Sequence, residues 1–359
     1  MSTGVVTVAS PMEAALEVLT PVLHHDEASK GIIAAKCIGL MAGYDARWRN
    51  APFRIDAVES VVSSDLYNPT SKARSRTFTV SGKIDVRATE LSTGARVIFD
   101  HKTTSQEIAD PNATYWRQLV IEGQVSHYFL LEWLNDTKAD YAMWDAVRKP
   151  AIAPKMLAKK DQQAVMAFGQ YCERQLNEEQ LDEFAASKEG RETSLMYAYR
   201  LAYDCTTERP EWYFQRRQVP RLDSEVLEYA KELWDHSQDL IVARRTGRNP
   251  RNSGACMTYN SPCKFLSICS GYDSPDGEGW TRKTWVHPEL PILQGNGKEI
   301  LTNSRIRTFQ TCRRKHQLQY DIGIEKIDEE EKESLYFGSL WHDAQEAYFL
   351  TLKSIQERN

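Results

Sequence analysis

Long apolar runs are missing from this sequence. The best candidate, residues 31–43, is short and contains Lys36, so we expect no membrane-spanning helix. The amino-terminal residues lack the basic segment and long apolar stretch that are typical of a secretory signal. The glycine and proline contents are also low, at 18 and 14 of 359 residues, and they exclude collagen-like and low-complexity chains.

A large excess of charge of either sign is absent as well. The 45 basic and 50 acidic residues leave a formal net charge of −5. This balance argues against a generally basic nucleic-acid coat protein, but it permits a local basic groove because net charge does not report how charge is distributed. The hydrophobic content of 41% is enough to bury a core. The length fits about two domains, or one elaborated α/β domain.

Cysteine is present in an odd number, seven. Without a secretory signal, this count predicts reduced thiols and a cytoplasmic location. Cys256, Cys263 and Cys269 fall within fourteen residues in the pattern C-x6-C-x5-C, which indicates ligation of a metal or an iron–sulfur cluster more than disulfides. The remaining cysteines of the amino-terminal two-thirds are expected to be buried apolar positions: Cys37, Cys172 and Cys205.

The hydrophobic pattern predicts a mixed sheet with helices packed on it, hence an α/β fold. Strands are expected at residues 53–62, 76–88, 95–103, 139–147 and 212–219, the second and third forming an antiparallel hairpin. Helices are expected at residues 10–23, 27–47, 115–134, 161–189, 224–245, 304–320 and 338–354. Residues 246–299 break the pattern and end in a linker-like segment.

The predicted hairpin carries the strongest chemical pattern. Asp100 and Lys102 are two residues apart on a strand and therefore face the same side, which Asp85 on the neighbouring strand can reach. Two carboxylates beside a lysine suit Mg²⁺ or Mn²⁺. Such an ion and the lysine can promote attack of water on a phosphate. Taken alone, Asp-x-Lys is more often an exposed pattern with a salt bridge.

Together with the next helix, these segments resemble the PD-(D/E)xK nuclease superfamily, specifically its RecB-like and Cas4-like branch. The branch pattern is G-x-x-D, then D-x-K-T, then a helix with Q-x-x-x-Y, and residues 82–85, 100–103 and 124–128 match it. Ile84 stands where the superfamily name has proline, at a position that varies among members. The resemblance implies a restriction-endonuclease-like mixed sheet flanked by helices. It also implies catalytic roles for five residues: Asp85, Asp100, Lys102, Gln124 and Tyr128.

Residues 304–315 resemble the helix S-x-[IL]-x-x-[FY]-x-x-C-x-x-[KR] of the iron–sulfur members of this branch. The resemblance implies that Cys312 joins the three clustered cysteines to hold a [4Fe–4S] cluster. Zinc is the alternative, because four thiolates serve both groups. The cysteine spacing departs from the tighter C-x2-C-x5-C of many relatives.

Residues 338–342 are close to the branch motif G-x-x-x-H. The resemblance makes His342 a metal ligand beside Asp85, Asp100 and the backbone carbonyl of His101. Two carboxylates are weaker candidates for the same site: Glu346 and Glu59.

The order of these motifs is unusual. In relatives, the helix with the distant cysteine and the G-x-x-x-H motif precede the Asp and D-x-K strands, whereas here they come last. We therefore predict a circularly permuted domain, with a nuclease core over residues 1–293, cysteine ligands within residues 250–270, and a linker at 294–300. Residues 301–359 would correspond to the amino-terminal part of relatives and fold into the same domain. Residues 1 and 359 are then expected to lie near each other, as are Cys312 and Cys256.

These features predict a metal-dependent deoxyribonuclease, acting as an exonuclease on single strands or DNA ends. Its expected partners are DNA and proteins of recombination, repair or CRISPR adaptation, with no membrane. Two alternatives remain open: a non-catalytic DNA-binding or assembly module on the same fold, and a zinc-stapled enzyme of unrelated chemistry. Basic clusters offer phosphate contacts: Arg313, Arg314, Lys315, Arg216 and Arg217.

Overall fold

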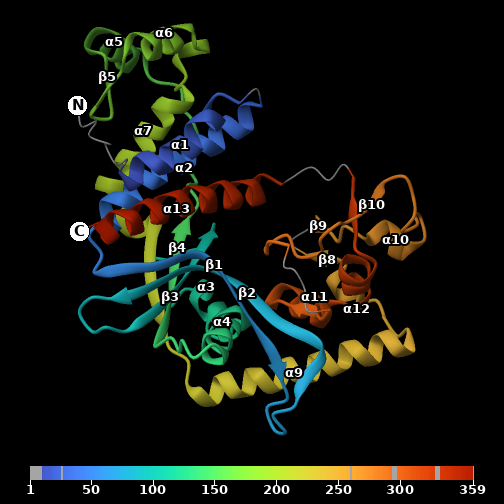
Figure 1. The fold of residues 1–359 in the computed structure, drawn as a ribbon. Helices are drawn as coiled ribbons and strands as arrows, with labels where there is room; N and C mark the ends of the chain where they lie inside the picture. The colour runs from blue at the N-terminus through green and yellow to red at the C-terminus, as the bar shows by residue number, and fades with distance from the viewer. Residues whose placement is uncertain (1–9, 26, 259–260, 293–296, 328–331, 359) are drawn as a thin grey trace, which may run out of the picture.

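The computed structural model describes all residues except 1–9, 26, 259–260, 293–296, 328–331 and 359. Figure 1 shows a central sheet with helices on both faces and a smaller lobe to one side, which contains the clustered cysteines. The predicted mixed α/β architecture is confirmed. Within the described part of the chain, no helix is long and apolar enough to cross a lipid bilayer.

The central sheet is built from six strands in the order β1-β2-β3-β4-β7, with β11 also paired to β2. The pairs β1–β2, β2–β3 and β4–β7 are antiparallel, whereas β3–β4 and β11–β2 are parallel. The predicted hairpin is therefore confirmed as β2 and β3. The bounds of the strands are β1 (Phe53–Tyr67), β2 (Arg74–Glu90), β3 (Arg96–Thr104), β4 (Tyr141–Arg148), β7 (Phe214–Val219) and β11 (Glu299–Leu301).

One face of the sheet is covered by α1 (Pro11–Leu23), α2 (Ala28–Trp48), α7 (Ser194–Tyr203) and α13 (Glu333–Arg358). Tyr44 of α2 and Trp341 of α13 are fully buried there, with their rings 5.9 Å apart. α1 packs directly on α13, so the first and last described helices are neighbours (Figure 1). Residues 1 and 359, whose proximity the permutation predicts, lie outside the described residues.

The opposite face is covered by α3 (Thr114–Leu119), α4 (Gly123–Leu134), α9 (Asp223–Thr246) and α11 (Asn303–Thr311). Gly82 of the G-x-x-D motif allows this packing. A Cβ atom there would lie 3.0 Å from a Leu131 methyl and 3.3 Å from the Tyr128 ring. The glycine therefore lets α4, which carries the Q-x-x-x-Y motif, lie directly on β2.

The helix predicted at residues 161–189 is wrong as a single element. It is divided into α5 (Lys159–Phe168) and α6 (Glu178–Ala186) by a short hairpin of β5 (Gln170–Tyr171) and β6 (Arg174–Gln175). Gly169 ends α5 with φ at 63°, a left-handed conformation that glycine adopts without strain. The Asn177 side chain then accepts a hydrogen bond from the Gln180 N–H (2.9 Å) and starts α6.

Two more predicted helices are interrupted. The helix at 115–134 divides into α3 and α4 at residues 120–122, where the Arg221 guanidinium donates to the carbonyl of Val120 (2.7 Å). The helix at 304–320 is broken at Cys312, whose backbone is extended (φ −161°, ψ 112°) between α11 and α12 (Arg313–His316). A π-helical turn, Gln317–Ile322, follows. The hydrophobic pattern also did not predict α7 or α8 (Pro210–Tyr213) as separate helices.

The lobe beside the sheet, which we call the cysteine lobe (residues 250–282 and 312–326), has its own small core. The ring of Phe265 stacks on Trp280 with centroids 5.5 Å apart, and Leu318 and Ile324 complete the core. The predicted linker is shorter than 294–300, because Glu299 and Ile300 belong to β11. The short elements of the lobe are β8 (Met257–Thr258), β9 (Ser261–Pro262), α10 (Leu266–Ser270), β10 (Trp280–Arg282) and β12 (Ile324–Lys326).

Candidate active site

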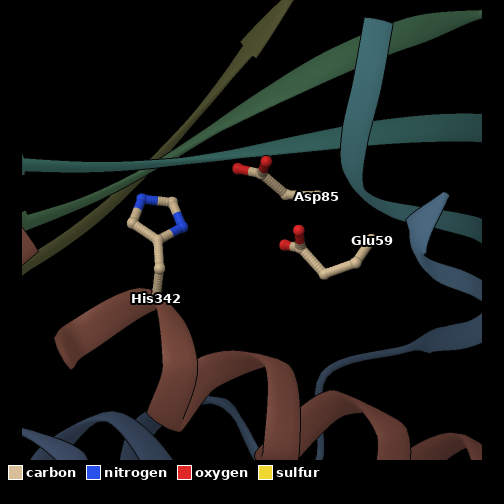
Figure 2. Close-up of side chains that lie close together, drawn as sticks. All are labelled: Glu59, Asp85 and His342. Atoms are coloured by element: carbon tan, nitrogen blue, oxygen red, sulfur yellow. The ribbon is translucent and has the colours of Figure 1, made fainter. Parts of the chain in front are cut away.

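Three potential metal ligands from distant parts of the chain lie together in the structure. One ligand atom each from Glu59 of β1, Asp85 of β2 and His342 of α13 lies within 4.8 Å of the others. Figure 2 shows both carboxylates and the imidazole directed toward a common space. The three side chains line a cavity of about 350 Å³. The structure thus brings His342 beside Asp85, although the two residues are 257 positions apart in the sequence.

Glu59 is the ligand candidate that the sequence ranked lowest. The register of β1 and β2 on either side places it opposite Asp85, and like charges at opposed positions of a sheet repel each other. Its φ of 48° is also a strained conformation for a residue other than glycine. Lys83 forms an ion pair with Glu59 from the same side. Two carboxylates and an imidazole that face one space are a donor set that a bound cation could share.

The D-x-K and Q-x-x-x-Y motifs form one hydrogen-bonded chain. The Lys102 ammonium lies 2.6 Å from Asp100 Oδ2 and donates to Gln124 Oε1 at 2.8 Å. The amide of Gln124 in turn donates to the hydroxyl of Tyr128 (2.8 Å). The i, i+4 spacing of Gln124 and Tyr128 places both on one face of α4, where they are hydrogen-bonded to each other. These contacts hold the ammonium group of Lys102 in one position beside Gln124, which itself lines the cavity.

Asp100 is buried, at 1% exposure, and lies next to the three-ligand group rather than within it. Apart from the ion pair with Lys102, neither of its carboxylate oxygens has a hydrogen-bond partner among the described residues. Burial raises the pKa of Asp100, and the Lys102 charge opposes this shift. A buried carboxylate with unused lone pairs is the second indication that a cation belongs here.

The protonation states of the ligand candidates also suit a metal. Burial, and then the charge of Asp100, raises the pKa of Asp85 to about 7. The backbone N–H of His101 donates to Asp85 Oδ2 at 2.8 Å and partly offsets this effect. Burial lowers the pKa of His342 to about 3, so its imidazole is neutral and can offer a lone pair. The donor set of two carboxylates and one imidazole, with Asp100 alongside, fits Mg²⁺ or Mn²⁺.

We expect metal affinity to depend on pH through Asp85. Below pH 7 its carboxyl must lose a proton to act as a ligand, so the apparent affinity for Mn²⁺ should fall up to about tenfold per pH unit. Above pH 7.5 the affinity should level off, since His342 is neutral throughout this range. Calorimetric titrations with Mn²⁺ from pH 5.5 to 8.5 measure the profile, and Asp85→Asn should flatten it. A wild-type profile that is already flat would contradict this assignment.

His101 belongs to a buried charged network behind the site. Its Nδ1 lies 3.3 Å from Asp145 Oδ2, and its ring stacks on Phe349. The same carboxylate accepts a hydrogen bond from Arg216 (3.2 Å) and one from the hydroxyl of Tyr44. The prediction of Arg216 as a DNA contact is therefore wrong: its side chain is 9% exposed and neutralises Asp145 in the interior.

Arg216→Ala should consequently act on stability. Removing the guanidinium leaves the buried Asp145 carboxylate short of a cation, which costs about 3–5 kcal/mol of the free energy of unfolding. Arg54→Ala, which removes a surface ion pair with Asp56, is the matched control and should cost less than about 1 kcal/mol. Urea denaturation of both variants measures the difference. Equal stability of the two variants would show that the buried network does not hold the fold.

The other basic residues predicted to contact DNA lie at or near the surface. Arg217 donates to a backbone carbonyl and packs over a tryptophan ring, whereas Arg313 pairs with Asp239 at 2.9 Å. Arg314 donates to a glutamine side chain, and Lys315 lines a cavity of the cysteine lobe. Their contact with DNA, and the role of the His101 carbonyl as a ligand, stay predictions.

The four cysteines expected to act together are gathered in the cysteine lobe. Burial and the proximity of the other three thiols raise the pKa of Cys269. The carbonyl of Cys256 accepts a hydrogen bond from the N–H of Cys263 (2.8 Å), and the Asn252 side chain donates to the carbonyl that precedes Cys312. Of the cysteines predicted to be buried, Cys37 and Cys205 are buried. The prediction for Cys172 is wrong, because it lies half-exposed in the β5–β6 turn with φ at 45°.

The family model described as the PD-(D/E)XK nuclease superfamily matches residues 300–358, the segment that contains α11, Cys312 and His342. This match supports assignment to that superfamily, whose members are generally hydrolytic nucleases that use divalent metals. The curated proteins and the solved structures gave no match.

Proposed function

We propose that this protein is a metal-dependent DNA nuclease, acting as an exonuclease on single strands or DNA ends. The observation that supports the proposal is that Glu59, Asp85 and His342 meet in one cavity, which is also lined by Gln124, the hydrogen-bond partner of Lys102. The ion pair of Glu59 with Lys83 accounts for one of these side chains, whereas a shared metal ion would account for all three. Protein partners from recombination, repair or CRISPR adaptation, and a cytoplasmic location, belong to the same proposal.

Each side chain has a distinct task in this reading. Glu59, Asp85 and His342, with Asp100 beside them, would hold Mg²⁺ or Mn²⁺, which when bound activates water and neutralises charge on the phosphate. Lys102 is positioned by Asp100 and Gln124 to orient the attacking water and to stabilise the charge that grows on the phosphate oxygens. Tyr128 fixes the amide of Gln124 through their hydrogen bond.

The cysteine lobe would hold a [4Fe–4S] cluster on Cys256, Cys263, Cys269 and Cys312. All three other thiols act on the pKa of Cys269, which supports one group shared by the four cysteines. Zinc is the alternative, because four thiolates serve both groups.

The circular permutation is part of this proposal. The matched segment, residues 300–358, supplies α11 and α13, which the resemblance assigns to the start of related chains. Two observations support it: His342 reaches the site of Asp85, and Cys312 reaches the other three cysteines. Moreover, α1 packs on α13, so the described ends of the chain are neighbours.

The alternative is a non-catalytic DNA-binding module on the same fold. Incubation of the purified protein with end-labelled single-stranded, duplex and circular single-stranded DNA, in Mn²⁺ or in EDTA, distinguishes the two. The nuclease proposal predicts loss of linear single strands in Mn²⁺ and protection in EDTA, with circular DNA resisting an exonuclease. Binding of DNA without cleavage of any substrate would favour the module.

A further inference from the structure

We propose that a single DNA strand engaged at the metal site continues along the first half of α13 and is held in a basic groove on the cysteine lobe. This inference rests on the proposed nuclease function and adds the path of the strand to it. It concerns residues outside the metal site, which the catalytic assignment does not use.

Three cavities of the structure adjoin one another along α13. The cavity of the metal site ends at His342 and Asp343. A second cavity, of about 630 Å³, is lined by the same two residues and extends to Leu335 near the start of the helix. A third cavity, of about 1290 Å³, lies on the cysteine lobe and shares Leu335 with the second. The three hollows therefore follow one another along α13, each sharing a lining residue with the next.

The middle part of this path is lined by small side chains and by one lysine. Gly338 and Ser339 line it, and a Cβ atom on Gly338 would have only Thr103 Oγ1 near it, at 3.7 Å. The fold would thus accommodate a larger side chain at position 338, and the glycine keeps the cavity above the helix open. Lys149 lines the same cavity and donates to the carbonyl of Ser334 (2.8 Å). Its charge is thereby fixed beside the path.

Lysines line the far end of the path. Four of them, from separate segments, face the cavity on the cysteine lobe: Lys264, Lys315, Lys326 and Lys332. Ammonium groups along a groove match a chain of phosphates, which carries negative charge at every nucleotide. Residues 328–331, which follow Lys326 in the sequence, are acidic and lie outside the described residues.

An aromatic side chain in the same cavity favours a single strand over a duplex. Tyr272 lines the groove and is 91% exposed. Exposed rings in basic grooves stack on unpaired bases without regard to sequence, whereas the bases of a duplex are already stacked on each other. The groove thus offers both contacts that sequence-independent single-strand binding uses: cations for the backbone and a π-face for a base.

Binding in EDTA tests the path apart from cleavage. Fluorescence anisotropy with labelled oligothymidylate of about 20 nucleotides compares Lys315→Ala/Lys326→Ala with Lys159→Ala/Lys160→Ala, which removes two exposed lysines of the α5 end. We expect the first variant to bind about tenfold more weakly, and its log Kd against log salt slope to fall by about 1.4, since each lost phosphate contact removes about 0.7. Tyr272→Ala should weaken binding about fivefold, and Tyr272→Phe should not.

Hydrolysis of bis(p-nitrophenyl) phosphate, which is too small to reach the groove, should be equal in all these proteins and shows that each folds with its metal site intact. The path is refuted if the groove variant binds oligothymidylate with the affinity and salt slope of the control variant. It is also refuted if the groove lysines matter only for duplex DNA. Failure of the wild-type protein to cleave any DNA would instead refute the proposed function.

Discussion

Lys102→Ala should abolish DNA cleavage while leaving Mn²⁺ binding nearly unchanged. The ammonium group of Lys102 is held by Asp100 and Gln124, but Lys102 is not one of the three side chains that meet as candidate ligands. Loss of a single preorganised group that stabilises transition-state charge costs about 10²–10³ in rate. Single-turnover cleavage of labelled single-stranded DNA in saturating Mn²⁺ measures this loss.

The comparison needs two further variants. Lys159→Ala removes an exposed lysine of α5 and should cleave at the wild-type rate. Gln124→Ala should fall between wild type and Lys102→Ala, because it removes one of the two groups that position the ammonium. A Lys102→Ala protein that retains more than about a tenth of the wild-type rate would remove this lysine from the chemistry.

Cys312→Ser should remove the iron–sulfur cluster and destabilise the protein strongly. A [4Fe–4S] cluster requires all four thiolates, and Cys312 is the only one of the four on the α11–α12 side of the lobe. The wild-type protein is expected to be brown, with absorbance near about 400 nm, and the variant to lose that absorbance. Because ligation contributes to folding, we also expect the thermal midpoint to fall by about 5–10 °C.

Cys172→Ser is the matched control, since Cys172 is half-exposed and far from the other thiols in the sequence. It should keep both the absorbance and the thermal midpoint. A colourless wild-type protein that contains one zinc would support the zinc alternative. A Cys312→Ser protein that keeps the absorbance and the midpoint would show that this thiol is not a ligand.

Short-range patterns in the sequence were enough to predict the catalytic hairpin. Period-two alternation and the turn at Gly94 define β2 and β3, and the two-residue spacing of Asp100 and Lys102 places them on one face. The four-residue spacing of Gln124 and Tyr128 likewise places both on one helix face, where Gln124 meets Lys102 and Tyr128 meets Gln124. Each of these inferences depends on neighbours in the sequence, whose geometry is fixed by the secondary structure alone.

The features that the sequence did not predict correctly depend on contacts between residues far apart in the chain. Glu59 lies at the site because of the register between β1 and β2, which no local pattern reports. In the sequence it is one of two carboxylates of the predicted strand, and nothing local distinguishes it from Asp56. Arg216 belongs to a run of polar residues that is typical of an exposed strand. In the structure its side chain is buried instead, because it forms an ion pair with the buried Asp145 on the paired strand. The helix at 304–320 is broken at Cys312, a position that helical periodicity alone does not mark.

A metal ion held between Glu59, Asp85 and His342 is the central feature of the proposed site. Crystals grown with Mn²⁺ and measured at a wavelength where manganese scatters anomalously locate that ion directly. We expect an anomalous peak within coordination distance of Asp85 and His342, and its loss in Asp85→Asn. Mn²⁺-dependent cleavage in solution without any peak between these residues would contradict this assignment.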